Sequence, residues 1–231
     1  FGNIRVGVVY FHRTNRKEIG YRNESVPPSA YTEQSVAVPG GEQGPGGTAT
    51  FYDMDPAYLG LKDFVYRNEE LLDTTFNGVD INIKKRMSNR WQIMGGITFG
   101  ANRGGVMGGS KDLNDPNIFL VYPEGIVGND AKFMSKFSGT YMGPWDINIS
   151  GSLIYNNGYP YQSQYRITRS LYPDLTRSSQ VVTLSERGEE RFDNVFMIDL
   201  RFSRSFDLGG GRYIEPQIEL FNINNTDAVT R

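Results

Sequence analysis

Residues 76–100 read FNGVDINIKKRMSNRWQIMGGITFG, and this stretch decides the fold class. Its first half has one apolar side and one polar side, the apolar one with Val79, Ile81 and Ile83 and the polar one with Asp80, Asn82 and Lys84. After a short break at Ser88-Asn89, the alternation resumes at Trp91 and continues to Phe99. A period of two is typical of β-strands. The stretch therefore predicts two long antiparallel strands joined by a tight turn.

The same alternation recurs along the chain and predicts about seven strands of roughly 11–14 residues, at about 3–14, 76–86, 91–100, 132–141, 145–155, 196–203 and 214–220. Short turns near 87–90, 142–145 and 207–211 alternate with long loops at about 15–70, 104–130 and 158–191. Strands of soluble proteins average about 5–6 residues, whereas a tilted membrane strand needs about 9–11. Outer-membrane barrels combine short turns at one end with long loops at the other. We therefore expect residues 1–231 to form one all-β domain, an antiparallel up-and-down transmembrane β-barrel segment that is incomplete.

Aromatic residues at the ends of the predicted strands support the membrane interpretation. Such rings form girdles at the two membrane interfaces of a barrel. The predicted girdle residues are Trp91, Phe99, Tyr141, Trp145 and Tyr155. From Trp145 to Tyr155 the strand would rise about 25 Å across the membrane at ~40° tilt. The alternative is that the two tryptophans are core residues of a soluble β-sandwich.

The other side of the predicted sheet is polar, with Asp80, Asn82, Lys84, Asp146, Asn148, Ser150, Glu215, Gln217 and Glu219. A soluble sandwich also exposes a polar face. The choice between the two classes therefore depends on strand length, loop alternation and the girdle taken together.

The composition excludes several classes of protein. The chain of 231 residues has a net charge of −2, without the basic excess of a nucleic-acid-binding protein. It has no cysteine for a disulfide or a thiolate metal site. Mean hydropathy is −0.46 and no apolar run reaches the roughly 20 residues of a membrane-spanning helix. No signal peptide opens the chain, so we expect a fragment whose export signal lies elsewhere.

Several stretches resemble the barrel of TonB-dependent transporters, in particular the Oar-like group that carries a carboxypeptidase-regulatory-like domain. They are YRNESVPPSAY at 21–31, TFNGVD at 75–80, KRMSNRW at 85–91, GPWDINISG at 143–151 and ELFNINN at 219–225. Each motif is weak alone, but their order and spacing extend over nearly the whole chain. The resemblance therefore rests on the combination.

The resemblance implies a 22-stranded barrel that is filled by an N-terminal plug and energised through the TonB complex. It implies energised uptake of a ligand such as a peptide, carbohydrate or metal chelate across the bacterial outer membrane. The expected partners are outer-membrane lipid and lipopolysaccharide, together with the plug and the TonB complex through parts absent from this chain. The sequence lacks a plug, a TonB-contacting segment and a final strand ending in an aromatic residue, so about a third of the barrel is expected.

The sequence offers no catalytic set, no metal site and no cofactor motif. The single histidine, His12, lies on a predicted strand without a matching nucleophile motif. Gly209 to Gly211 separate two strands and predict a hairpin turn rather than a phosphate-binding loop. Four loop residues could offer oxygen ligands to calcium but lack the spacing of a calcium loop, namely Asp112, Asn114, Asp115 and Asn117. We expect these, like Asp53 and Asp55, to be solvated loop residues.

Two loop segments are candidates for contact with ligand or lipid. Tyr159, Tyr161 and Tyr165 lie at the start of the third long loop, where aromatic side chains would suit a sugar or a peptide. The alternative is an aromatic rim that packs on itself. The charged run 186–191 is expected at the outer rim, solvated rather than bound to lipopolysaccharide.

We therefore predict an outer-membrane transport barrel without enzymatic activity. The alternatives are a soluble β-sandwich that binds carbohydrate, with a closed core between two sheets, and a passive porin of the same fold. An all-β hydrolase is the weakest alternative. The deciding observation is whether lipid or protein covers the side that carries Val79, Ile97, Ile149 and Leu200.

Overall fold

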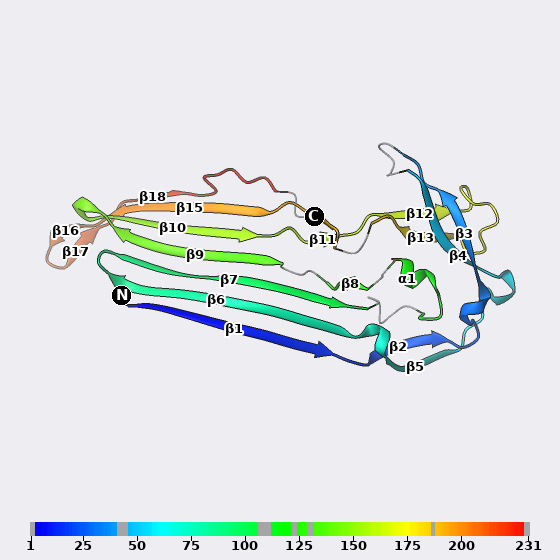
Figure 1. Cartoon of the computed structure of the whole chain (residues 1–231). Coiled ribbons are helices and arrows are strands. Elements are labelled where there is room, and N and C mark those ends of the chain that lie inside the picture. Colours follow the sequence, from blue (N-terminus) through cyan, green and yellow to red (C-terminus); the bar gives the residue numbers. More distant parts are fainter. Residues whose placement is uncertain are drawn as a thin grey trace.

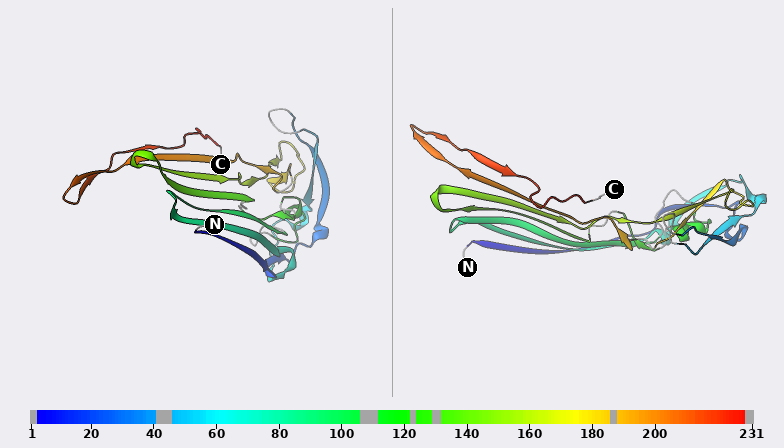
Figure 2. Two further views of the ribbon diagram at one scale, coloured as in Figure 1. Left: turned by 60° about the vertical axis from the view of Figure 1, so that its left-hand side comes forward. Right: turned by 90° about the horizontal axis from the view of Figure 1, so that it is seen from above.

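The computed structural model describes residues 3–40, 46–105, 112–121, 124–128, 132–185 and 188–228. Long strands lie side by side in one curved layer, and most of the shorter strands gather beyond one of its ends (Figure 1; Figure 2). The strands of the layer follow the order β1-β6-β7-β9-β10-β15-β18, and every neighbouring pair is antiparallel. The predicted fold class is confirmed: the chain is all-β, with an antiparallel up-and-down sheet that does not close on itself within the described residues.

Six of the seven strands in this order are long, and their bounds are β1 Ile4–Asn15, β6 Thr74–Ser88, β7 Trp91–Gly104, β9 Phe133–Met142, β10 Ile147–Asn156 and β15 Val195–Arg204. β8 (Gly125–Ile126) pairs with the far end of β7. The seventh strand, β18 (Gln217–Leu220), has four residues, far fewer than the roughly 11–14 predicted for each strand. Pro216 immediately precedes β18, and a proline has no N–H to donate to a ladder. β1 and β18 are the two edges of the sheet.

Tight turns join the strands at one end of the sheet, which we call the turn end. Asn89 and Arg90 both have positive φ (51° and 69°) between Ser88 and Trp91, which face each other across the ladder. Such a two-residue turn matches the twist of a hairpin. Beyond β15 the chain forms a separate hairpin of β16 (Phe206–Gly209) and β17 (Arg212–Ile214). The predicted glycine turn at 209–211 joins these two strands.

Trp145 and Asp146 were predicted to begin a strand, and this prediction was wrong. Both residues have a φ of 58° and lie in the short 3-10 turn Pro144–Asp146, so β10 begins only at Ile147. Pro144 fixes its own φ and ends the extended backbone. Glu215, predicted on the polar side of a strand, lies between β17 and β18.

The sheet has two faces of opposite character. The apolar face carries Ile4, Val6, Val8, Tyr10, Val79, Ile81, Ile83, Trp91, Ile93, Ile97, Phe99, Phe133, Phe137, Tyr141, Ile149, Leu153, Tyr155, Phe196, Ile198, Leu200, Phe202, Ile218 and Leu220. The polar face contains rows that run across the strands, such as Lys84, Met94, Ser138, Ser152 and Asp199. The register therefore keeps the predicted alternation in step from strand to strand.

The connections at the other end form a layer of their own, which we call the loop layer. Loop 1 (16–73) contains two ladders, β2 (Glu18–Asn23) with β5 (Phe64–Glu69) and β3 (Tyr31–Ala37) with β4 (Thr48–Met54). It also contains the 3-10 turns η1 (Pro28–Ala30), η3 (Pro56–Tyr58) and η4 (Glu70–Leu72). Loop 2 (105–132) carries α1 (Asn117–Val121). Loop 3 (157–194) contains β11 (Pro160–Tyr161) with β14 (Glu190–Arg191) and β12 (Gln164–Thr168) with β13 (Ser179–Thr183). The regions predicted as loops therefore contain four short ladders or hairpins of their own.

All buried apolar side chains of the described residues lie in the loop layer. Loops 1 and 3 share the main cluster, which consists of Val38, Ala49, Phe51, Ile167, Leu175 and Val182. The long strands contribute none, and Val79, Ile97, Ile149 and Leu200 are only half-buried. The described residues therefore place no second sheet on the apolar face, in contrast to the closed core of a β-sandwich.

Candidate functional site

An aromatic row crosses four neighbouring strands of the apolar face near the loop layer. The ring centres of Phe99 and Phe133 lie 5.0 Å apart, those of Phe133 and Tyr155 5.3 Å, and those of Tyr155 and Phe196 6.3 Å. Tyr10 lies in the same row, because it is opposite Val79 on β6 and Val79 is opposite Phe99 on β7. Phe99 and Tyr155 are predicted girdle residues, whereas the sequence analysis did not place Phe133, Phe196 and Tyr10 in the same row. Strand register, which the sequence does not give, would have identified them.

A second aromatic group lies at the turn end of the same face. Trp91 and Tyr141 are directly opposite each other on β7 and β9. Trp145 lies in the next turn with 75% of its surface exposed. From Trp91 to Phe99 the strand rises about 26 Å, or about 20 Å across the sheet at the usual barrel tilt. The apolar face is therefore a band of nearly membrane thickness with aromatic residues at both limits.

Lys85 is a charged residue on this face at the turn end of the band. Its side chain is buried, and its Nζ donates to the Ser88 carbonyl (2.7 Å), the Ser88 Oγ (2.9 Å) and the Trp91 carbonyl (2.8 Å). The Nζ also lies 3.9 Å from the centre of the Trp91 ring. The turn thus satisfies the ammonium group, which lets a lysine occupy the apolar face.

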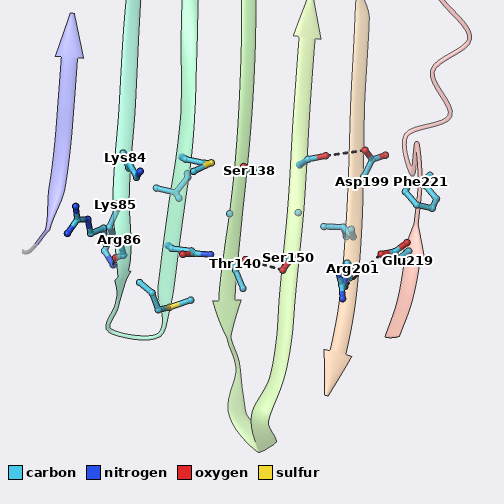
Figure 3. Close-up of a pocket in the computed structure, with 18 residues that line it drawn as sticks. Lys84, Lys85, Arg86, Ser138, Thr140, Ser150, Asp199, Arg201, Glu219 and Phe221 are labelled. Atoms are coloured by element: carbon cyan, nitrogen blue, oxygen red, sulfur yellow. Dashed lines mark hydrogen bonds and ion pairs between the residues drawn. The ribbon is translucent and has the colours of Figure 1, made fainter. Parts of the chain in front are cut away.

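The polar face has a hollow of about 450 Å³ near the turn end. Figure 3 shows Lys84 and Arg86 on β6 at one side, and Asp199, Arg201 and Glu219 on β15 and β18 at the other. Short hydroxyl side chains line the middle on β9 and β10, namely Ser138, Thr140, Ser150 and Ser152. Because these side chains are small, they leave the space between the charged sides open. A hollow of this size can hold a small polar ligand or a short protein segment.

The acidic residues of this hollow already have partners. Asp199 accepts hydrogen bonds from Ser152 Oγ (3.1 Å) and from the Asn222 backbone N–H (2.8 Å). Glu219 lies 3.8 Å from Arg201. Thr140 and Ser150 hydroxyls are within 3.0 Å of each other. The two carboxylates on the β15 side of the hollow, Asp199 and Glu219, are therefore already engaged within the sheet.

In the loop layer, the prediction that the four loop-2 residues are solvated was wrong: Asn114, Asp115 and Asn117 are buried and Asp112 is half-buried. Asp112 Oδ1 accepts from the backbone N–H of Asn23 (2.9 Å), and Asn114 Nδ2 donates to the Asn23 carbonyl (3.0 Å). Asn117 bonds to both backbone groups of Tyr52, at 2.7 Å and 2.8 Å. Side chains that pair with a strand's backbone in this way are expensive to leave unpaired. These residues fasten loop 2 to loop 1.

Asp115 and Arg177 extend this fastening to loop 3. Arg177 Nη1 lies 2.5 Å from Asp115 Oδ2, and its Nη2 donates to the Tyr31 hydroxyl at 2.9 Å. Burial, with the nearby Asp115 carboxylate, raises the pKa of Tyr31 to about 12. Asp53, also predicted to be solvated, accepts from the Thr176 N–H of loop 3 at 3.1 Å. Asp55 is exposed and caps the short turn η3 by accepting from Ala57 N–H.

The three candidate tyrosines occupy different environments. Tyr159 is 47% exposed, and Tyr161 is 39% exposed with its ring 4.8 Å from that of Phe192. Tyr165 packs against the cluster shared by loops 1 and 3. Of the charged run, residues 186 and 187 lie outside the described residues. Glu190 accepts from Ser163 Oγ (2.7 Å) and Ser185 Oγ (2.9 Å), and these hydrogen bonds lower its pKa.

His12 is exposed, and its Nδ1 lies 2.9 Å from Asn77 Oδ1. No group of three or more histidine, aspartate or glutamate side chains within the described ranges is placed to hold a metal ion. No helix among them is long and apolar enough to cross a bilayer.

No protein-family model matches the chain, and no curated protein does. A search of solved structures finds the outer membrane transporter YddB from Escherichia coli, with a TM-score of 0.48 and 12% identity. The alignment covers 100% of this chain and 28% of that one. The chain thus spans little more than a quarter of the length of that transporter.

Proposed function

We propose that this chain forms part of the wall of a β-barrel transporter in a bacterial outer membrane. The observation that carries the proposal is the uncovered apolar face, limited at both ends by aromatic residues. In water such a face would expose a large continuous hydrophobic surface, which soluble monomers rarely do. In a bilayer, lipid covers it. The polar face then lines the barrel interior, and the loop layer lies outside the cell.

Membrane insertion also requires that the two edges of the sheet be paired. Unpaired N–H and C=O groups cost several kcal/mol each in hydrocarbon, so barrels in membranes are closed. We infer that β1 and β18 pair with further strands in the intact protein. The exposed backbone edge of β1 is long enough for a complete membrane strand.

A pair of arginine substitutions in the intact protein tests the membrane assignment. Leu153 lies between the two aromatic groups on the apolar face, and Ser152 is its neighbour on the polar face. Arginine near the bilayer midplane costs about 2–4 kcal/mol. Leu153→Arg should therefore lower the free energy of unfolding from phosphatidylcholine vesicles by that amount relative to Leu153→Ala, and Ser152→Arg by less than about 1 kcal/mol. Equal costs on the two faces would contradict the proposal.

We further propose that transport is TonB-dependent and brings in a peptide, a carbohydrate or a metal chelate. The support is the resemblance of the five sequence motifs, together with the large ordered loop layer. Uptake should stop when a proton uncoupler is added, because TonB transmits the proton gradient of the inner membrane. Uptake that continues at an unchanged rate would favour a passive porin.

Tyr159 and Tyr161 remain the proposed ligand contacts, since both are partly exposed in the loop layer. The double substitution to alanine should reduce ligand uptake, whereas Tyr213→Ala, an exposed tyrosine at the turn end, should not. Unchanged uptake in the double variant would remove these residues from the site. Lipid and lipopolysaccharide around the apolar face are the proposed surroundings.

A further inference from the structure

Two positive charges face each other on the polar face of the first ladder. Arg5 on β1 and Lys84 on β6 are directly opposite in register, so their side chains leave the same face at neighbouring positions. Cβ atoms of such pairs are about 5 Å apart, and like charges there repel each other. Arg86 adds a third positive charge at the rim of the hollow. We call Arg5, Lys84 and Arg86 the cationic patch.

Within the described ranges, the side chains of the cationic patch have no carboxylate partner. The acidic residue of β6 on the same face, Asp80, is four residues from Lys84, about 13 Å along the strand. Asp199 and Glu219 on the far side of the hollow are engaged by Ser152 and Arg201. The repulsion within the patch is therefore not compensated by the sheet itself.

The hollow provides space beside the patch. Lys84 and Arg86 line it together with the short hydroxyl side chains of β9 and β10, so a group bound at the patch can extend over these hydroxyls. Hydroxyls donate hydrogen bonds to oxyanions, and guanidinium and ammonium groups bind them through charge-assisted hydrogen bonds. Lys84 and Arg86 at one side of the hollow and Ser138 in its middle thus present donors to the same space (Figure 3).

We propose that the cationic patch binds an oxyanion, a carboxylate or a phosphate, against the polar face near the turn end. This inference rests on the proposed function, because it takes the polar face as the inside of a barrel. The anion has two sources with the same chemistry. It is carried by a solute that passes along the face, or it belongs to an acidic side chain of a protein segment that lies against the face.

Lysine footprinting of the intact protein in detergent tests the proposal. Lys84 is acetylated at low reagent concentration with and without 10 mM succinate or inorganic phosphate, and Lys62, an exposed residue of loop 1, serves as reference. We expect either anion to slow acetylation of Lys84 at least fivefold and to leave Lys62 unchanged. The Arg5→Gln/Arg86→Gln variant should lose this protection. Arg13→Gln, on the same face of β1 but eight residues toward the loop layer, should retain it.

A carbodiimide cross-link distinguishes the second source. If an acidic side chain already occupies the patch, Lys84 is protected without added anion, and carbodiimide joins its Nζ to a protein carboxylate other than Asp80. In either case 0.5 M NaCl should restore acetylation, because screening weakens charge pairs. Acetylation of Lys84 at the rate of Lys62 under all conditions, without a cross-link, would overturn the proposal. So would protection that salt leaves unchanged.

The footprinting result can be distinguished from the result of the arginine substitutions that test the membrane assignment. The footprint is read in detergent and needs no bilayer, so anion protection in a protein that tolerates Leu153→Arg would reject the membrane assignment alone. A protein with the expected arginine costs and no protection of Lys84 would reject the anion site alone.

Discussion

Asn117→Ala should open the loop layer without disturbing the long strands. Asn117 is 3% exposed, and its side chain bonds to the N–H and the C=O of Tyr52 and to Asp115 Oδ1 at 2.7 Å. Alanine leaves the two Tyr52 backbone groups without a partner, at about 1–3 kcal/mol for each unsatisfied group. Partial hydration reduces the sum, so we expect a loss of about 2–4 kcal/mol.

Hydrogen exchange followed by mass spectrometry measures this loss of stability peptide by peptide. A loss of about 2–4 kcal/mol corresponds to about 30- to 700-fold faster exchange if opening is in rapid equilibrium. Peptides of β4 and β13 should both show it, because loops 1 and 3 share one core, while peptides of β9 and β10 should not. Asn68→Ala, at an exposed position of β5, is the matched control.

Asn117→Asp separates hydrogen bonding from packing. Aspartate keeps the acceptor for the Tyr52 N–H but loses the donor and puts a second carboxylate beside Asp115. We therefore expect at least the effect of alanine, despite the smaller change in shape. Exchange that rises less than threefold in both variants would refute the idea that loop 2 fastens loop 1 to loop 3.

Three further predictions concern the core, the glycines and pH. Phe51→Ala should lower the free energy of unfolding of the loop layer by about 3–5 kcal/mol, because Phe51 is completely buried. Limited proteolysis measures this unfolding. Gly95→Ala should lower the free energy of urea unfolding of the sheet by about 1–3 kcal/mol, because the new Cβ would lie 2.3 Å from Phe137 Cδ1. Gly7→Ala is the control: its Cβ would have nothing within 4 Å, so the free energy of unfolding should change by less than about 0.5 kcal/mol. The hydrogen bond from Arg22 lowers the pKa of Glu69, so this bond stabilises the fold fully above the unfolded pKa of about 4.3, and the stabilisation is lost as the pH falls through the lower folded pKa. Hydrogen exchange of β2 should rise in that pH range, and Arg22→Gln should weaken the pH dependence, while Arg67, 3.4 Å from Glu69, keeps a part of it.

The long strands could be predicted from the sequence because their signal is local. Alternation between Val79, Ile81 and Ile83 and their polar neighbours determines both the strand and its two faces, without knowledge of any partner strand. Trp145 was misplaced because alternation does not reveal a positive φ. Register was also out of reach, and with it the aromatic row that joins Phe99 to Phe133.

The loop layer could not be predicted because its stabilising contacts are distant in the sequence. Phe51 packs with Ile167 and Val182, more than a hundred residues away. Asn117 was predicted to be solvated because it lies in a loop rich in aspartate and asparagine that lacks calcium-loop spacing. Its partner, the backbone of Tyr52, lies 65 residues earlier. A single side chain that hydrogen-bonds to the backbone of a strand produces no periodic pattern in the sequence.

The two parts of the molecule are stabilised in different ways, and this difference supports the proposed orientation. The loop layer buries Phe51, Leu113, Ile167 and Val182 among its own residues, so it can keep its structure in water. The long strands bury no apolar side chain and need an apolar surrounding that the described chain does not provide. A bilayer around the strands with the loop layer in water satisfies both requirements. The reverse placement would expose the apolar band to water and put the Asp115–Arg177 pair in hydrocarbon, at a desolvation cost of several kcal/mol per ion.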